Sequence, residues 1–483
     1  MSVLPVLCTL ALLPMPREFT PGDGFCGDPA KIEYTVDRSL PAEGYTLNVT
    51  KEGVRITSAT PAGHFYAERT LDDLKADGRL PICRIKDAPA YRWRGLHLDE
   101  SRHFFGKQVV KRFIDRMAAL KFNVFHWHLT DHQGWRLQID ACPELTEKGS
   151  IRNVPEWKRM RPREWLDVDA AAYGPYFYTK DDVREILSYA HARHITVMPE
   201  IEIPGHSLAA IRACPFLLCP DSRDKLDKLG YRCATICAGS DEVLRFYEKV
   251  LDEVCALFPS VYIHTGGDEA RKDIWRECPR CQARIKKEGL KDETELQAWL
   301  TRHFADYLAA KGRRLVGWDE ILEGDALAAG AVVMSWRGRK GAIAAAMAGH
   351  DVILCPEQYC YYDFRQGLAN DPETYHGKSR QFAPVSAAMV YSFDPCEGIP
   401  SDRRGHVIGA QGNSWTELTL DEKTLDWKLW TRAAALAEVL WTSPEKRDFS
   451  AFAPRLEAFR AKLKAKGVNV APFADPSAMP SVF

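Results

Sequence analysis

Short apolar runs alternate with longer amphipathic stretches along most of the chain. From Trp93 onward each apolar run ends in polar or aromatic residues, and the segment after it has apolar positions every three or four residues. That spacing is typical of a helix with one buried face. The runs predict eight strands, at residues 95–99, 124–131, 196–203, 261–268, 314–318, 331–336, 352–355 and 407–415. Helices between them are expected at residues 108–120, 182–193, 242–258 and 295–310, among others.

Eight cycles of strand and helix predict parallel strands closed into a barrel. We therefore expect an α/β protein whose residues 90–445 form a (β/α)8 TIM barrel. Residues 446–483 are expected to be a C-terminal helical extension, with a helix at 449–466 packed on the barrel exterior.

The first 89 residues follow a different pattern. Alternating stretches at 45–49 and 54–57, separated by the Lys51-Glu52-Gly53 turn, predict a β-hairpin. A segment with helical spacing follows at 62–74. Residues 1–89 are therefore expected to form a small N-terminal α+β domain.

Composition and charge narrow the classes of function. With 46% apolar residues and 13 Trp, 17 Tyr and 21 Phe in 483 residues, the chain can build a large core, which excludes a disordered or coiled-coil protein. The 65 basic and 66 acidic residues give a net charge of -1, so nothing global favours nucleic acid or an anionic membrane as a partner. The oligomeric state cannot be predicted.

The apolar stretch at residues 3–15 is too short for a membrane-spanning helix, which needs about 20 residues. It is either a clipped export signal or the first strand of the mature protein. We expect an exported protein, periplasmic or secreted.

The 14 cysteines do not decide the compartment. Cys278 and Cys281 have the spacing of metal ligands, but zinc needs four ligands and no second close pair with histidine accompanies them. A local disulfide or two structural thiols is the favoured interpretation. In an exported protein, bridges could also form in one loop-like region that holds Cys214, Cys219, Cys233 and Cys237. We expect neither a metal nor another cofactor.

Candidate chemistry gathers where the predicted strands end, because the carboxyl ends of barrel strands converge on one mouth. These ends carry acids together with Trp and Tyr, a mixture that suits a neutral, hydroxylated ligand such as a sugar. No phosphate-binding glycine loop and no Gly-x-Ser-x-Gly elbow is present. His126, His128 and Asp131 could suggest a catalytic metal, but the two histidines share one strand face and a third oriented ligand is required.

The segment His264-Thr-Gly-Gly-Asp-Glu269 is the most informative. Two adjacent carboxylates cannot easily flank a glycosidic bond as the usual catalytic pair does. If Glu269 is the general acid, Asp268 is better placed to hold a 2-acetamido group that itself attacks the anomeric carbon. The alternative is a pair of solvated acids at a bulge of the barrel rim.

Nine motifs in sequence order resemble glycoside hydrolase family 20, the β-N-acetylhexosaminidases, over the whole barrel. They are RGLHLDESRHF (94–104), FHWHLTD (125–131), QGW (133–135), PEIEIPGH (199–206), HTGGDE (264–269), GWDE (317–320), MSW (334–336), YYD (361–363) and NSWTE (413–417). The chain departs from the family in having Asp131-His132 where paired acids are usual, and Glu202 where Asp is usual. Both departures are expected to change the pH profile rather than abolish activity.

The resemblance implies an exo-acting enzyme that removes terminal non-reducing β-linked N-acetylglucosamine or N-acetylgalactosamine from glycans. Hydrolysis would retain configuration and pass through an oxazoline. In that scheme Glu269 is the acid and base, and Asp268 orients the acetamido group. The substrate pocket would comprise Trp318, Trp336 and Trp415 as walls, Tyr361 and Asp363 at the acetamido group, and Arg102 and Glu417 at the ring hydroxyls. Asp131, His206 and Glu202 would set the protonation of Glu269.

Two alternatives stay open. One is a lacto-N-biosidase or a sulfated-sugar hydrolase of the same family, whose wider subsites could be built by loops 221–231 and 365–380. The other is a catalytically silent sugar-binding protein, although Asp268 and Glu269 are both present.

Overall fold

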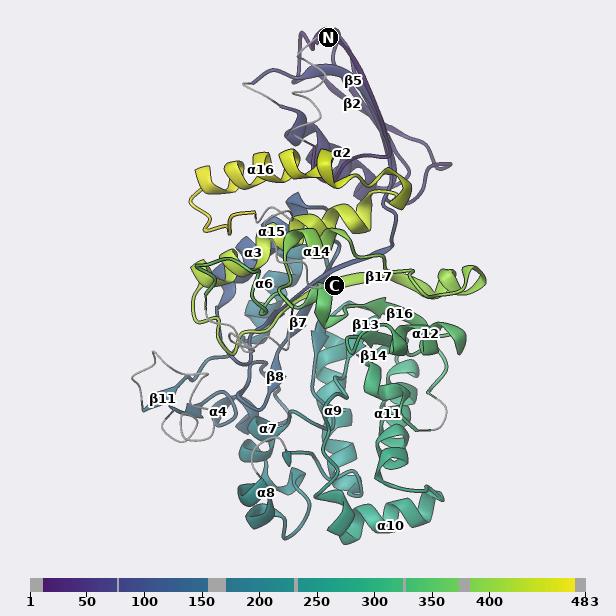
Figure 1. Cartoon of the computed structure of the whole chain (residues 1–483). Coiled ribbons are helices and arrows are strands. Elements are labelled where there is room, and N and C mark those ends of the chain that lie inside the picture. The colour runs from purple at the N-terminus through teal and green to yellow at the C-terminus, as the bar shows by residue number, and fades with distance from the viewer. Residues whose placement is uncertain are drawn as a thin grey trace.

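The predicted barrel is confirmed: eight parallel strands close in the order β12-β13-β14-β15-β16-β17-β6-β7 (Figure 1). The computed structural model describes residues 12–75, 78–154, 171–229, 233–324, 327–372 and 383–473. The barrel strands are β6 (Trp93–Asp99), β7 (Val124–His128), β12 (Thr196–Glu200), β13 (Tyr262–His264), β14 (Arg314–Trp318), β15 (Val332–Ser335), β16 (Asp351–Leu354) and β17 (Val407–Ser414). Each overlaps one predicted run.

Amphipathic helices surround these strands. In α9 (Asp241–Leu257) the buried positions include Val243, Tyr247, Val250 and Val254, which are three or four residues apart and face the barrel. The other outer helices are α3 (Lys107–Ala119), α6 (Lys180–His191), α11 (Glu293–Ala309), α12 (Lys340–Met347), α14 (Ala387–Tyr391) and α15 (Glu422–Trp441). The four helices predicted individually from the sequence are confirmed.

Short elements fill the connections that follow the strands, on the side where the mouth is expected. After β7 come β8 (Thr130–Asp131), β9 (Gly134–Trp135), α4 (Glu144–Glu147), β10 (Arg152–Asn153) and β11 (Ala172–Tyr173). After β12 come α7 (Leu208–Ala213), η2 (Pro215–Leu217) and α8 (Arg223–Leu229). After β13 come η4 (Trp275–Glu277) and α10 (Pro279–Glu288), after β14 comes η5 (Asp319–Leu322), and after β16 comes α13 (Glu357–Cys360). Two short helices lie elsewhere: η6 (Ser401–His406) directly precedes β17, and η7 (Pro444–Lys446) follows α15.

The N-terminal domain is a five-stranded sheet with one helix. The sheet order is β1-β5-β3-β4-β2, and β3 and β4 form the predicted antiparallel hairpin. Its strands are β1 (Glu18–Phe25), β2 (Ile32–Val36), β3 (Tyr45–Val49), β4 (Val54–Ser58) and β5 (Pro81–Asp87). Helix α2 (Pro61–Leu74) buries Tyr66, Leu71 and Leu74 in the same apolar cluster as Leu47 and Ile85. The expected α+β fold of this domain is therefore confirmed.

A buried polar cluster joins this domain to the barrel. The ammonium group of Lys121 donates to the hydroxyls of Tyr45 (3.1 Å) and Thr70 (2.7 Å) and lies 3.5 Å from the carboxylate of Asp87. The indole of Trp441, at the end of α15, donates to the same carboxylate at 2.9 Å. Residues of β3, α2 and β5 in the small domain thus contact Lys121, which follows α3, and Trp441 of α15. Specific polar contacts therefore attach the small domain to the barrel.

The last two helices lie between the barrel and the small domain (Figure 1). Helix α16 (Phe449–Ala465) pairs Arg455 with Glu438 of α15 and reaches Asp73 of α2 through Lys462 at 3.3 Å. From Leu425 to Trp441, only Trp427 is not fully buried. Helix α15 is therefore covered on all sides, by the barrel and by α16.

The N-terminal apolar stretch falls mostly outside the described residues, which begin at residue 12. Leu12 and Leu13 are buried, and the first described strand begins at Glu18. None of the helices in the described ranges combines the length and apolar character needed to cross a membrane.

Candidate active site

The residues predicted from the sequence all lie at or just beyond the carboxyl ends of the barrel strands, where they form one connected group. Asp268 and Glu269 follow β13, Trp318 ends β14, and Trp336 comes directly after β15. The others follow β6 (Arg102), β7 (Asp131), β12 (Glu202, His206), β16 (Tyr361, Asp363) and β17 (Trp415, Glu417).

The backbone of the segment after β13 takes unusual conformations. Gly266 and Gly267 have φ angles of +65° and +102°, and Glu269 has a φ of +45°. A non-glycine residue in this region carries a strain of roughly 1–3 kcal/mol, and such residues cluster at functional sites. The result is that Glu269 presents a side chain that is 56% exposed, while Asp268 beside it is 13% exposed.

His206 connects the two acids to Asp131. Its Nδ1 atom lies 3.0 Å from Asp131 Oδ1, and its Nε2 atom lies 3.4 Å from Asp268 Oδ2 and 3.7 Å from Glu269 Oε2. Burial alone would lower the pKa of His206, but the carboxylates of Asp131 and Asp268 hold it well above its ordinary value. The surroundings of His206 therefore favour its cationic form, and its Nε2 atom faces both acids.

One oxygen of Asp268 is left for a ligand. Its Oδ1 atom is buried and has no hydrogen-bond partner among the described residues, whereas Oδ2 faces His206. A buried acceptor without a partner is costly unless a bound molecule supplies the donor. This atom is suited to accept an N–H or O–H from a ligand.

Aromatic side chains surround the same space. Trp415 has its ring 5.9 Å from that of Trp318 and 6.2 Å from that of Tyr361, and Tyr361 stacks on Trp336 with centroids 6.1 Å apart. The Arg102 guanidinium lies over the Trp415 ring at 4.8 Å. Trp318 is only 1% exposed, so it lies deeper than the other two tryptophans.

Arg102 is held among carboxylates. Its terminal nitrogens lie 2.8 Å from Asp131, 3.3 Å from Asp99 and 3.8 Å from Glu417. Burial alone would raise the pKa of Asp131, but Arg102 and His206 hold it well below its ordinary value. Arg102 therefore connects Glu417, after the last barrel strand, to Asp131 and the acid network.

Glu202 lies under the catalytic loop and carries no hydrogen bond on Oε2 within the described part of the chain. A Cβ atom on Gly266 would stand 1.8 Å from that oxygen, so the glycine allows the carboxyl group to approach. Burial, together with the charges of Asp268 and Glu200, raises the pKa of Glu202 well above its ordinary value. The surroundings of Glu202 therefore favour its neutral, protonated form.

Glu200 is a functional residue to which the sequence analysis assigned no role. Its carboxylate accepts from Trp318 at 2.9 Å and lies 2.8 Å from His264 and 3.1 Å from His126, and it also contacts His128. The only signal in the sequence was the alternate-residue spacing of His126 and His128, which places both side chains inside the barrel. Through the hydrogen bond from the Trp318 indole, Glu200 positions Trp318 from inside the barrel.

Glu320 was also left without a role. It accepts a hydrogen bond from the Trp336 indole at 3.0 Å. Burial and the nearby Asp268 carboxylate raise the pKa of Glu320 to about 8. Glu320 therefore positions the side chain of Trp336.

The loops considered for wider subsites lie in part, at 230–231 and 373–380, outside the described residues.

Several groups of side chains are close enough to hold an ion. At the mouth these include His97, His126 and Glu200, and also Asp131, His132 and His206. The oxygens of Glu200 and Asp131 already take part in the hydrogen bonds described above. A further group consists of Cys219, Cys237, Cys278 and Cys281.

The bridges suggested between Cys214 and Cys219 and between Cys233 and Cys237 are not formed, because all four thiols are free. Cys214 lies 3.1 Å from Cys142 of the preceding connection, and Cys219 lies 3.7 Å from Cys281. Closeness in sequence therefore did not indicate the spatial partners.

Comparison with known proteins gives consistent matches. The family model described as "Glycosyl hydrolase family 20, catalytic domain" matches residues 91–444, and "Glycosyl hydrolase family 20, domain 2" matches residues 27–88. A "Beta-hexosaminidase" of Porphyromonas gingivalis is 41% identical over 450 residues, and one of Vibrio furnissii is 38% identical over 422. The matches cover 90% and 84% of this chain, and 55% and 67% of the two relatives. The chain thus spans little more than half of the first relative.

A solved structure described as a GH20 exo β-N-acetylglucosaminidase from Vibrio harveyi, in complex with N-acetylglucosamine, superposes with a TM-score of 0.86 at 30% identity. The match covers 96% of this chain and 78% of that one. A β-N-acetylhexosaminidase from Bacteroides fragilis superposes with a TM-score of 0.83 at 29% identity, covering 98% and 99% of the two chains.

Proposed function

This chain belongs to glycosyl hydrolase family 20, and from that premise we propose that it is an exo-acting β-N-acetylhexosaminidase. It removes a terminal, non-reducing β-linked N-acetylglucosamine or N-acetylgalactosamine from a glycan. The observation that carries the proposal is the pairing of an exposed Glu269 with the unpartnered Oδ1 of Asp268 on one strained loop.

In the first step Glu269 donates its proton to the glycosidic oxygen while the carbonyl oxygen of the substrate's acetamido group attacks the anomeric carbon. The bond to the leaving group breaks and an oxazoline forms. Asp268 accepts a hydrogen bond from the acetamido N–H and stabilises the positive charge that develops on that group.

In the second step the Glu269 carboxylate takes a proton from water, and the water oxygen attacks the anomeric carbon and opens the oxazoline. Two inversions at one carbon retain the configuration. His206 lies within 3.7 Å of both catalytic acids and faces them throughout the two steps.

The surrounding residues account for recognition. Trp336 and Trp415 supply apolar faces for the ring and the N-acetyl methyl group, and the Tyr361 hydroxyl is available to the acetamido oxygen. Arg102 and Glu417 lie 3.8 Å apart, a spacing that lets both bind ring hydroxyls of one terminal sugar. Asp363 lies in the same strand-end connection as Tyr361.

A panel of aryl glycosides tests the proposal. We expect hydrolysis of the β-N-acetylglucosaminide, the β-N-acetylgalactosaminide or both, inhibition by a thiazoline analogue of the oxazoline, and little hydrolysis of the β-glucoside. Equal rates on the glucoside would contradict substrate-assisted catalysis. A rate on a disaccharide aryl glycoside above that on the monosaccharide would favour a lacto-N-biosidase, and binding without turnover would favour a silent sugar-binding protein.

A further inference from the structure

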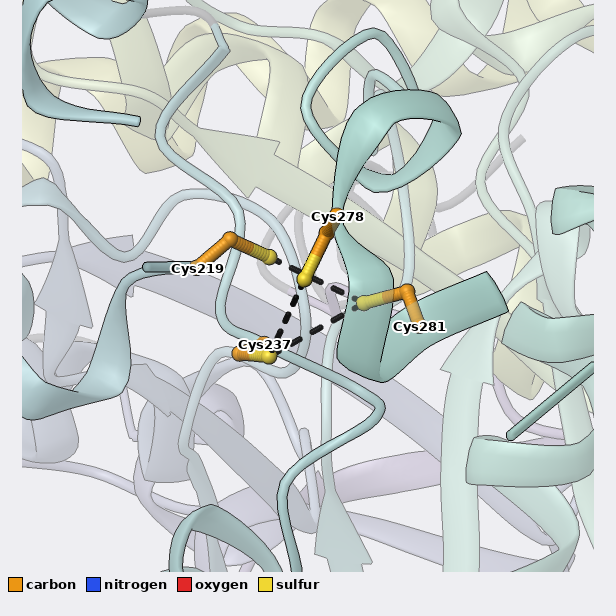
Figure 2. Close-up of side chains that lie close together, drawn as sticks. All are labelled: Cys219, Cys237, Cys278 and Cys281. Atoms are coloured by element: carbon orange, nitrogen blue, oxygen red, sulfur yellow. Dashed lines mark hydrogen bonds between the residues drawn. The ribbon is translucent and has the colours of Figure 1, made fainter. Parts of the chain in front are cut away.

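Four cysteines from two separate connections converge on one point (Figure 2). Cys219 and Cys237 belong to the connection after β12, while Cys278 and Cys281 belong to the connection after β13. All four side chains are buried, with exposures between 0% and 2%. The spacing of Cys278 and Cys281 suggested a metal site in the sequence, and the structure supplies the second pair of ligands that the sequence appeared to lack.

The sulfur positions match a tetrahedral metal site. Cys219 and Cys281 have their sulfurs 3.7 Å apart, and Cys237 lies 3.8 Å from both Cys278 and Cys281. All the ligand atoms lie within 4.8 Å of one another. A zinc ion bound by four thiolates at about 2.3 Å gives a tetrahedron with edges of about 3.8 Å. An iron–sulfur cluster would need wider spacing, because its own iron and sulfide atoms lie between the cysteines.

We propose that Cys219, Cys237, Cys278 and Cys281 bind one Zn²⁺ ion. Four protein ligands leave no open position, so the ion has a structural role. The site is distinct from the catalytic mouth and does not depend on the proposed function.

The backbone around the cluster is already in the required arrangement. The Cys237 amide donates to the carbonyl of Leu217 at 2.8 Å. This bond joins the segment that carries Cys237 to the segment just before Cys219. The Trp275 indole donates to the carbonyl of Ile236 at 2.8 Å, which joins the second connection to the first. A Cβ atom on Gly239 would lie 2.2–2.3 Å from backbone atoms of Arg280 and Cys281, so the two connections touch there directly.

The local electrostatics favour thiolates, the form that binds metal. Helix α10 begins at Pro279, with Cys278 at its N-cap and Cys281 in its first turn. The positive end of the helix dipole stabilises negative charge at these positions. Four thiolates carry two more negative charges than the zinc ion neutralises, and the helix end compensates part of that excess.

The proposed ion would hold together the two loops that carry the catalytic groups. Cys219 follows His206 by thirteen positions, and Cys278 follows Glu269 by nine. The Thr235 hydroxyl also donates to the carbonyl of Arg271 at 3.1 Å, near the catalytic segment. Loss of the metal should therefore loosen the His206–Glu269 geometry as well as lower the stability.

Metal analysis of the full chain, purified under reducing conditions without added metal, is the direct test. We expect about one zinc per chain. Titration of the thiols with a mercurial should release that zinc, seen with a colorimetric zinc indicator. Replacement of zinc by Co²⁺ should give the visible absorption bands of tetrahedral cobalt thiolate. Iron in place of zinc, no bound metal after equilibration with zinc, or two disulfides within the quartet by mass spectrometry would each overturn the proposal.

Variants separate the site from a general effect of cysteine loss. Cys281→Ser should reduce bound zinc at least tenfold and lower the melting temperature. Cys360→Ser, at a buried thiol after β16, should leave the zinc content unchanged. If Cys281→Ser does not fold, the cobalt spectrum and zinc release of the unaltered chain still decide the question. A Cys281→Ser protein that keeps a full equivalent of zinc would contradict the assignment.

Discussion

Gly266 lies so close to Glu202 that a methyl group at position 266 would stand 1.8 Å from the carboxyl oxygen Oε2. The glycine also has a φ of +65°. Two separate costs therefore attach to any side chain here: backbone strain and collision with a buried acid.

Gly266→Ala should lower the free energy of unfolding by about 2–5 kcal/mol, from left-handed strain plus overpacking. It should also abolish most activity, because the loop that carries Asp268 and Glu269 must move. Chemical denaturation and hydrolysis of an aryl N-acetylglucosaminide measure both effects. Gly312→Ala is the matched control, since Gly312 has a φ of +70° with nothing within 4 Å of the added methyl. It should cost only about 1–2 kcal/mol, and equal costs for both variants would contradict the collision.

Glu269→Gln should lower kcat by about 10²–10⁴ on substrates with poor leaving groups, because the amide cannot donate the required proton. The loss should be much smaller with a dinitrophenyl leaving group, which departs without protonation. Initial rates across a series of aryl leaving groups measure this. Glu277→Gln, at an exposed position after the same strand, should behave as the unaltered protein. A uniform loss across the series would argue against a general acid at position 269.

Asp268→Asn should reduce kcat on N-acetyl substrates by about 10²–10³, the usual effect of removing one group that stabilises transition-state charge. Its melting temperature should stay close to that of the unaltered protein, since Oδ1 has no partner to lose and the asparagine oxygen can still accept from His206. Single-turnover kinetics and thermal unfolding distinguish the two effects. Asp273→Asn, which weakens surface ion pairs with Arg271 and Arg276, is the control. Full activity in Asp268→Asn would exclude the assigned role.

Asp131→Asn should move the alkaline limb of the pH–rate profile to lower pH by about one unit, which corresponds to a lost interaction of ~1.4 kcal/mol. The raised pKa of His206 depends on Asp131 and Asp268. Its charge is fully present below the ordinary value of 6.5 and is lost as the pH rises through the raised value. Removing the charge of Asp131 lowers the pKa of His206, so the charge of His206 is lost at a lower pH. Asp115→Asn, on the exterior, is the control and should leave the pH–rate profile unchanged. An unchanged profile in Asp131→Asn would contradict the role assigned to the His206 charge.

Lys121→Met should lower the free energy of unfolding by about 3–5 kcal/mol, because it leaves the Asp87 carboxylate buried without its cation. Lys121→Met with Asp87→Asn should recover part of that loss, since the uncompensated charge is gone. Denaturant titration of both variants, with activity measured on the folded protein, checks the prediction. A double variant less stable than the single variant would show that the pair is not the source of the cost.

The strand positions could be predicted because each strand is a short apolar run that ends in polar or aromatic residues, as the run before His264 to Glu269 does. Helix α15 could not be singled out by amphipathic spacing, because it has almost no solvent face from Leu425 to Trp441. A periodicity method detects a helix only when one side of it meets water.

The candidate site was predicted as a set of residues, but its internal connections were not. Glu200 contacts side chains from three other strands, β7, β13 and β14, and no local pattern shows which side chains meet at a barrel centre. The cysteine quartet was missed for the same reason. Cys219 and Cys237 are separated by helix α8 and contribute one ligand each, so no close pair marks them.

The pairing of β6 with β17 makes the first and last barrel strands neighbours. The amide and hydroxyl of Thr416 bond to Asp99 across this seam, and Glu417 lies 3.8 Å from Arg102. During synthesis, Arg102 is therefore made some three hundred residues before its partner emerges. The half of the mouth that we propose binds the sugar can form only at the final closure of the barrel, so a nascent chain that stops before Val407 has no complete site.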